Sequence, residues 1–229
     1  CSFVSENINK RITDAPFINT FTSENTTNKL WSSSNTSVAT VNANTGEVTL
    51  IAAGNTYIQV TQEADATYCA VSASYLLTIF KSEPTAHVTN FDAVNNGSSA
   101  IILAWTDATD ADGYLIKATT TSYEAITVPA DGIPESDSTL VKNVVQGEGI
   151  FEFTGLATGT TYYFKIWPYN NSDTGINYKT DDTVPVISAT TRPLSAPAAN
   201  AATDISTDAF TENWNAVSGA TEYEVNVYI

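Results

Sequence analysis

Apolar and polar residues alternate with a period of two along most of this chain, and no stretch shows the 3.6-residue period of an amphipathic helix. Such alternation is typical of strands that turn one face toward a core. Short turn signals separate the alternating stretches. One example is Asn44-Thr45-Gly46, where Gly46 is free to adopt positive φ in a hairpin. The pattern therefore predicts an all-β chain of short strands.

Two aromatic residues recur at a fixed spacing. Trp105 and Tyr114 are nine residues apart, and Trp214 and Tyr223 repeat that spacing 109 positions later. Each pair joins the end of one strand, across a polar turn, to the start of the next. A repeat at this distance indicates stacked domains. The first copy continues for a whole domain and the second for two or three strands, so we expect a segment of a longer modular protein.

The first unit, expected at residues 1–81, carries an ordered series of motifs. Trp31 opens a Trp-Ser-Ser-Ser-Asn stretch, followed by Val-Ala-Thr-Val ending at Val41, a Thr-Gly-Glu-Val hairpin ending at Val48, and an Ala-Gly turn at Gly54. This series resembles the bacterial Ig-like domains of group 2 over residues 8–80. The resemblance implies a small β-sandwich of surface proteins, with Trp31 in its core and no catalytic residues.

The second unit is expected at residues 84–192, after a short polar junction. Its Leu156-Ala-Thr-Gly-Thr-Thr-Tyr162 string resembles the E–F corner of fibronectin type III domains. The resemblance implies that Trp105 is the core tryptophan, Leu156 the plug under the turn, and Tyr162 the corner tyrosine bonded to upstream backbone. Tyr114 is expected in the same core. Thr158 replaces the usual proline, and the unit is longer than the family, with an insertion near 124–149.

A proline-containing linker leads to residues 194–229, which resemble the opening of another fibronectin-type domain with Trp214 and Tyr223 at its core positions. Glu212 departs from the pattern, because Leu103 holds that position in the first copy and a charge is costly in a closed core. Because a truncated sandwich cannot bury both sheets, we expect this segment to be ordered only if something covers it. The chain is thus predicted to form tandem Ig-like and fibronectin type III β-sandwiches.

The turn-rich insertion resembles a subgroup of fibronectin-type domains in multidomain proteins that bacteria export through the type IX secretion system, some of them with nucleases. We therefore expect a non-catalytic structural or adhesive segment that spaces and presents other modules of a secreted or cell-surface bacterial protein. Its partners would be other domains of the same polypeptide. The alternatives are an accessory region of a secreted hydrolase, such as an extracellular nuclease, or a module that binds glycan or protein.

Composition narrows the possible functions and the location of the protein. The formal net charge is −16, and the nine Lys and Arg residues are scattered along the chain, so the clusters that bind nucleic acid are missing. No apolar window is long enough to predict membrane insertion. An acidic surface is typical of solubility outside the cell. We therefore expect an extracellular or cell-surface location.

The chain has two cysteines, Cys1 and Cys69. Cys1 precedes the first predicted strand, and Cys69 falls in the last predicted strand of the first unit. Because the first and last strands of a sandwich commonly lie close together, we expect a disulfide, which implies an oxidising compartment. The alternative is that Cys1 is a lipidated N-terminus, as in bacterial lipoproteins.

Catalytic motifs are missing from the sequence. The sole histidine, His87, has no nucleophile elbow to serve, and no phosphate loop or zinc motif occurs, so we expect neither enzymatic activity nor a cofactor. Asp107, Asp110 and Asp112 lie in one turn and form a weak calcium candidate. The same residue types build ordinary turns, which is the favoured interpretation.

Aromatic residues form the second binding candidate. If Tyr162 points inward, alternation directs Tyr163 and Trp167 outward, and Tyr169 and Tyr178 flank the following loop. Exposed aromatic side chains would stack on a sugar or pack on a protein. The alternative, which we favour, is that the extra segment between residues 123 and 149 folds over them.

Overall fold

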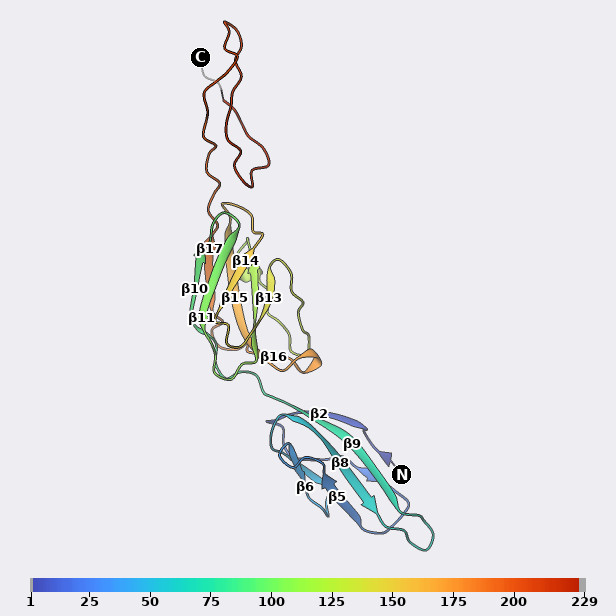
Figure 1. The fold of residues 1–229 in the computed structure, drawn as a ribbon. Coiled ribbons are helices and arrows are strands. Elements are labelled where there is room, and N and C mark those ends of the chain that lie inside the picture. The colour runs from blue at the N-terminus through green and yellow to red at the C-terminus, as the bar shows by residue number, and fades with distance from the viewer. Residues whose placement is uncertain (1, 227–229) are drawn as a thin grey trace.

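The computed structural model describes residues 2–226 and confirms an all-β fold. Strand pairs fall into two units that lie end to end (Figure 1). The first contains β1 (Ser2–Phe3), β2 (Asn7–Arg11), β3 (Phe17–Ile18), β4 (Phe21–Thr22), β5 (Lys29–Ser33), β6 (Ala39–Val41), β7 (Glu47–Leu50), β8 (Gly54–Gln62) and β9 (Val71–Phe80). The second contains β10 (Thr89–Asn95), β11 (Ala100–Thr106), β12 (Gly113–Thr119), β13 (Val141–Val145), β14 (Ile150–Thr154), β15 (Thr161–Asn170), β16 (Asn177–Tyr178) and β17 (Val186–Thr190). Two 3₁₀ turns, η1 (Tyr123–Ala125) and η2 (Asp173–Gly175), complete it.

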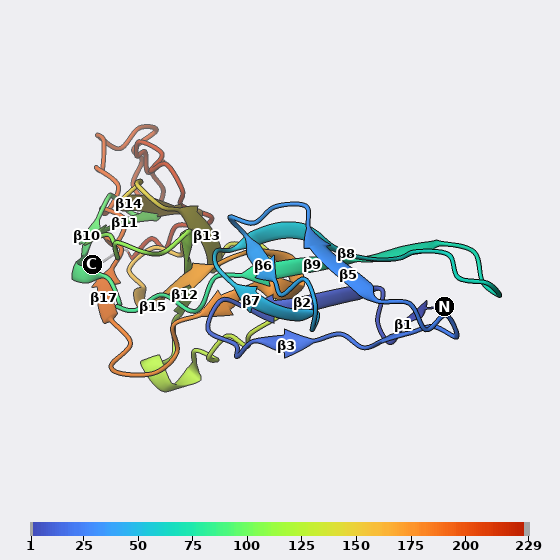
Figure 2. The ribbon, with the colours of Figure 1, turned by 90° about the horizontal axis from the view of Figure 1, so that it is seen from below.

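The first unit is a sandwich of a four-stranded sheet, β2-β9-β8-β5, and a three-stranded sheet, β3-β7-β6 (Figure 2). β2 runs parallel to β9, and the other pairs are antiparallel. Trp31 is 6% exposed and packs in the core with Ile58 and Tyr75. The hairpin turn needs Gly46, whose φ is +75° and whose added Cβ would lie 2.6 Å from the Trp31 ring.

The second unit places the sheet β10-β11-β14 against β13-β12-β15, with β16 and β17 on the far side of β15. Their inner faces close a core that contains Trp105, Tyr114 and Leu156. Trp105 and Tyr114 make an edge contact with ring centroids 5.5 Å apart. At the E–F corner, the Ala157 N–H donates to the Tyr162 hydroxyl at 2.9 Å. Such a bond from upstream backbone is the mark of a tyrosine corner.

The segment between β12 and β13 forms a third layer on the outside of the five-stranded sheet that contains β12 and β15. Ile126 packs there on Leu115, Trp167 and Tyr178. The Lys117 ammonium, which is 8% exposed, holds this layer through an ion pair of 2.8 Å with Glu135. β13 also lies inside the range expected for the insertion, so part of that range is sheet.

The third layer covers the aromatic residues that were expected to form an exposed ligand surface, so that expectation is corrected. Trp167 and Tyr178 are both 0% exposed, and Tyr163 and Tyr169 are half-buried. These side chains do lie on the outer face of the sheet, as the alternation predicts. That face, however, forms a second hydrophobic cluster and is not an open surface. Burial removes the contact area that a glycan or a protein would need.

Residues 198–226 form a loose hairpin with two isolated bridges, Ala199 to Trp214 and Thr203 to Thr211. Trp214 is 37% exposed and Tyr223 is half-buried, so neither occupies the closed core expected from the repeat. The physical reason is the lack of facing strands among the described residues. No helix in residues 2–226 has the length and apolarity to cross a bilayer.

The junction between the two sandwiches as candidate functional site

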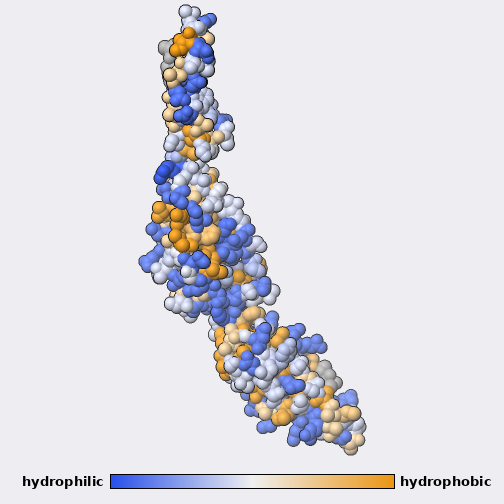
Figure 3. All heavy atoms as spheres, viewed as in Figure 1, coloured by the Kyte–Doolittle hydropathy of each residue, from blue (hydrophilic) through white to orange (hydrophobic). Residues whose placement is uncertain are grey.

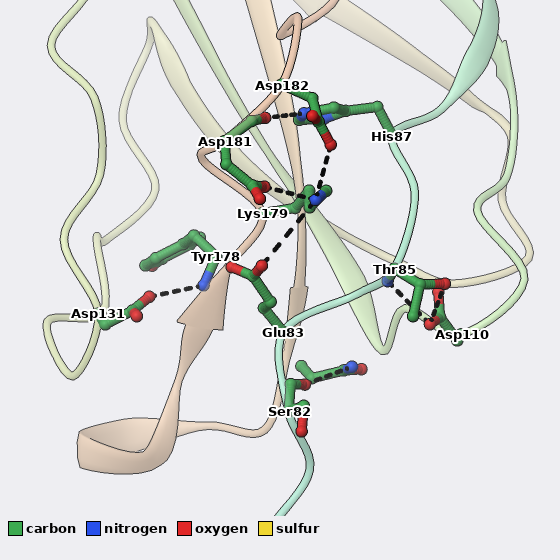
Figure 4. A network of polar contacts seen from close by, with 11 residues as sticks. Ser82, Glu83, Thr85, His87, Asp110, Asp131, Tyr178, Lys179, Asp181 and Asp182 are labelled. Atoms are coloured by element: carbon green, nitrogen blue, oxygen red, sulfur yellow. Dashed lines mark hydrogen bonds and ion pairs between the residues drawn. The ribbon is translucent and has the colours of Figure 1, made fainter. Parts of the chain in front are cut away.

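A network of polar contacts holds the connection between the units (Figure 4). We define the junction as the linker at residues 81–87 together with two loops of the second unit, at residues 107–112 and 170–182. Side chains of both loops bond to the linker backbone. The linker therefore lies along the second sandwich as part of its surface.

Two asparagines hold the first linker residues. The Lys81 N–H donates to Asn171 Oδ1 at 2.8 Å, and Asn171 Nδ2 donates back to the Lys81 carbonyl at 2.9 Å. Asn170, which is 3% exposed, donates from Nδ2 to the Ser82 carbonyl at 2.9 Å. A side-chain amide that both donates to and accepts from one residue imitates the pairing of a neighbouring strand. These bonds fix the direction in which the linker leaves β9.

The aspartates proposed for calcium have other partners. Asp110 Oδ2 accepts from the Thr85 N–H at 2.9 Å and from its hydroxyl at 2.7 Å. Asp112 forms an ion pair with Lys81, and its second oxygen accepts from the Asn171 N–H at 2.9 Å.

Asp107 serves the fold of the second unit. Its carboxylate accepts from Trp105 Nε1 and from the Gly147 N–H, both at 2.8 Å. The three carboxylates thus bond to three different places. Among the described residues no group of three acidic, histidine or cysteine side chains could hold a metal ion. The turn is structural, and this corrects the calcium candidate.

A buried ammonium organises the other end of the linker. Lys179 is 5% exposed and lies among Glu83 of the linker at 3.9 Å, Asp182 at 3.0 Å, and Asp181. The hydrogen bond to Asp181 raises the pKa of Lys179 and lowers the pKa of the Asp181 carboxyl. Burial raises the pKa of Glu83, and the charge of Asp181 adds to that effect. The ammonium therefore neutralises acidic groups that would otherwise repel one another.

His87 completes this end of the junction. Its Nε2 lies 2.8 Å from the Asp181 carbonyl, so this nitrogen carries the proton, because a carbonyl oxygen only accepts. The contact anchors the linker where it enters β10. Among residues 2–226, no hydroxyl or thiol is bonded to the ring, and the contact with the Asp181 carbonyl positions the linker.

The first unit touches the second directly as well. The Phe80 ring, at the end of β9, packs on Gly175 of η2, where an added Cβ would clash with it. Arg11 Nη1 donates to the Lys81 carbonyl at 3.4 Å, and the Ser82 hydroxyl donates to Thr13 Oγ1 at 3.4 Å. These longer contacts are weaker than those on the other side. The linker is thus held chiefly by the second unit, with the Phe80 contact as the main restraint from the first.

Sequence reasoning placed the linker but missed its receptor. Asn170 is the last residue of β15, and Asn171 and Lys179 lie in the segment after it, which the sequence marks only as polar. Cys69 is exposed in the loop before β9 instead of within the strand, which corrects the expected position. Cys1 lies outside the described residues.

Comparison with known proteins gives a family match for part of the first unit. Residues 17–71 match the family model of the bacterial Ig-like domain (group 2). Domains of that group occur in surface or extracellular proteins. No curated protein matches the chain.

Solved structures of fibronectin type III domains are among the structures similar to this chain. The FN1–FN3 domains of chicken CNTN1 are 14% identical with a TM-score of 0.42, covering 72% of this chain and 54% of that one. The chain thus spans about half the length of the chicken fragment. The fn3 domain of human contactin 1 is 16% identical with a TM-score of 0.37, covering 60% and 99% of the two chains. The FN5 domain of Drosophila Lar is 18% identical with a TM-score of 0.30, covering 47% and 96%.

Bacterial Ig-like domains of the kind matched over residues 17–71 are in general structural or adhesive modules that are not catalytic. The family match covers residues 17–71 of the first unit. For the second, the sheet order and the tyrosine corner carry the assignment.

Proposed function

We propose that this chain is a non-catalytic spacer of a secreted or cell-surface bacterial multidomain protein, and that it presents its neighbouring modules in a fixed orientation. The observation that carries the proposal is the junction, in which the linker backbone is bonded along its length to Asn170, Asn171 and Asp110. A linker with free backbone groups would let the sandwiches swing independently. A linker bonded in this way transmits orientation from one unit to the next.

The magnitudes favour a stiff connection. A hydrogen bond adds about 0.5–1.5 kcal/mol to the bonded arrangement, whereas an exposed ion pair adds about 0–1 kcal/mol. The asparagine and aspartate bonds to the backbone are of the first kind, and Asn170 is buried. The Phe80 contact adds apolar burial between the units. We therefore expect the relative orientation of the two sandwiches to depend weakly on salt concentration, because the strongest restraints on the linker are hydrogen bonds to neutral groups.

Distance measurements between two spin labels test the proposal. The labels are placed at the exposed residues Thr40 of the first unit and Thr154 of the second, in a chain whose two cysteines are serine. The parent should give one narrow distance distribution. Asp110→Ala, which removes both bonds to Thr85, should broaden it, whereas the control Asp92→Ala, an exposed aspartate outside the junction, should not. A broad parent distribution, or one that Asp110→Ala leaves narrow, would count against a bonded linker.

A glycan- or protein-binding role through the surface at Trp167 loses its support, because that side chain is fully buried. The accessory region of a secreted hydrolase remains compatible with a spacer, since both uses need a fixed connection. Export through the type IX system belongs to the same proposal. A culture fractionation with antibody to the chain, which should find it outside the cytoplasm, tests the location.

A further inference from the structure

The outer face of the four-stranded sheet of the first unit is polar and carries almost no charge. Its outward side chains on β8 are those of Asn55, Tyr57, Gln59 and Thr61. Neither β8 nor β9 contains a charged residue, although the whole chain has a formal net charge of −16. Over these two strands the first unit shows mainly hydrophilic and intermediate residues (Figure 3). The acidic chain repels an anionic ligand, and a cationic one finds no ion pair on β8 or β9, so this face fits a neutral ligand.

Tyr57 gives the face an aromatic ring that is 55% exposed. Leu76 of β9 lies opposite Tyr57, and Asn7 of β2 lies opposite Leu76, so the three residues form one row across the sheet. A tyrosine ring is rigid and offers a flat apolar surface at a low cost in conformational entropy. Such a surface stacks on the C–H face of a sugar ring.

A hollow of about 380 Å³ lies beside the Tyr57 ring, and Asn7 and Ser74 also line it. The hollow results from the register of the sheet. β2 begins at Asn7, and no strand of residues 2–226 pairs with residues 71–75 of β9 on the side away from β8. Binding sites for small molecules commonly have volumes of about 300–1,000 Å³, so the hollow is large enough for a ligand of that kind.

Side-chain amides surround the ring. Gln59 donates from Nε2 to the Ser72 hydroxyl at 2.9 Å, which orients its amide and leaves the amide oxygen as an acceptor. The amides of Asn7 and Asn55 are exposed and form no hydrogen bond with another side chain or backbone group in residues 2–226. Glu6, at the rim of the hollow, adds a carboxylate that can accept from a hydroxyl. Each amide offers two donors and an acceptor, which match neighbouring hydroxyls that both donate and accept.

We propose that this face is a binding site for a neutral carbohydrate. Tyr57 stacks on a sugar ring in the hollow, and Asn7 and Gln59 bond to its hydroxyls. The carbohydrate runs along β8, on which Tyr57 and Thr61 lie about 13 Å apart. At that end Thr61 lines a second hollow together with Leu30, which is 60% exposed. The face therefore suits a short stretch of polysaccharide better than a single sugar, and it would attach the chain to such a polymer as well as space its modules.

The test applies the whole chain to an array of neutral oligosaccharides of glucose, mannose, galactose or N-acetylglucosamine, with oligogalacturonate as the acidic counterpart. The neutral probe that binds best is then titrated into the chain, and backbone amide shifts in NMR spectra locate its site. At least one neutral probe should bind, and the shifts should fall on β8 and β9. Silence of every neutral probe, preference for oligogalacturonate, or shifts confined to the second unit would overturn the proposal.

Three variants assign the ring its role. Tyr57→Ala should weaken binding about tenfold, the loss expected of one aromatic contact, whereas Tyr57→Phe should keep most of it. Tyr68→Ala is the matched control, because Tyr68 is a tyrosine of the same unit that is 40% exposed and lies outside this face. Equal affinity of Tyr57→Ala and the parent would refute the site. Shifts of β9 amides that grow with protein concentration and need no sugar would refute it too, since the occupant would then be a second copy at the edge of β9.

Discussion

Replacing Tyr162 by phenylalanine isolates one hydrogen bond of the second sandwich. The Tyr162 ring is 5% exposed, and its hydroxyl accepts from the Ala157 N–H at 2.9 Å. Phenylalanine keeps the ring and removes only the oxygen. The lost bond and the unpaired N–H should together cost about 1–2 kcal/mol. For a domain of this size that corresponds to a fall in Tm of roughly 4–8 °C per kcal/mol.

The neighbouring residue provides the control. Tyr163 lies on the opposite face of β15, and its ring packs on Tyr123 with centroids 5.0 Å apart. Tyr163→Phe makes the same chemical change without removing a corner bond. Calorimetric unfolding, with hydrogen exchange of β15 to assign the transition of the second unit, compares the two variants. Equal stability of Tyr162→Phe and Tyr163→Phe would refute the structural role that we give to the corner hydroxyl.

Three further predictions follow from other parts of the molecule. Trp105→Ala should destabilise the second unit by about 3–5 kcal/mol in chemical denaturation, since the ring is buried; an unchanged midpoint would contradict this. Cys1 and Cys69 should appear as one linked peptide in non-reducing mass spectrometry, because Ser2 pairs with Thr22 beside the hollow that Cys69 lines, and the closed loop should add about 4 kcal/mol; free thiols in oxidised protein would refute the link. The pKa of Asp181 is lowered in the folded state, so its carboxylate contributes stability above the unfolded pKa, and this is lost as pH falls through the folded value. The free energies of unfolding of wild type and Asp181→Asn should therefore differ at neutral pH and converge at low pH. A difference that stays constant with pH would argue against the ion pair with Lys179.

Much of the fold could be predicted because its signals are local. The Thr45-Gly46 turn and the Leu156 to Tyr162 corner each depend on residues close together in sequence, and the structure has both features at those positions. Alternation also assigned the inward and outward faces of β15 correctly, with Phe164 inside one core. Period-two patterns report which face of a strand a side chain takes.

The remaining features depend on contacts between distant segments. Alternation places Trp167 on the outer face of its sheet, but only the fold brings Ile126 and Glu135 across to cover it. The calcium candidate failed for a related reason. Asp110 and Asp112 have the residue types of a metal loop, yet their partners are a linker some 25 residues away and a loop some 60 residues away. A single sequence carries no signal for such pairing.

If the bonded linker holds the two sandwiches, they should tumble as one body. Residual dipolar couplings measured for backbone amides of the first and second units test it directly, since each unit reports its own alignment tensor. The native chain should give tensors of equal magnitude and common orientation for the two units. Two tensors of clearly different magnitude would mean that the units tumble independently, and the bonded linker at Lys81 to His87 would then not hold them.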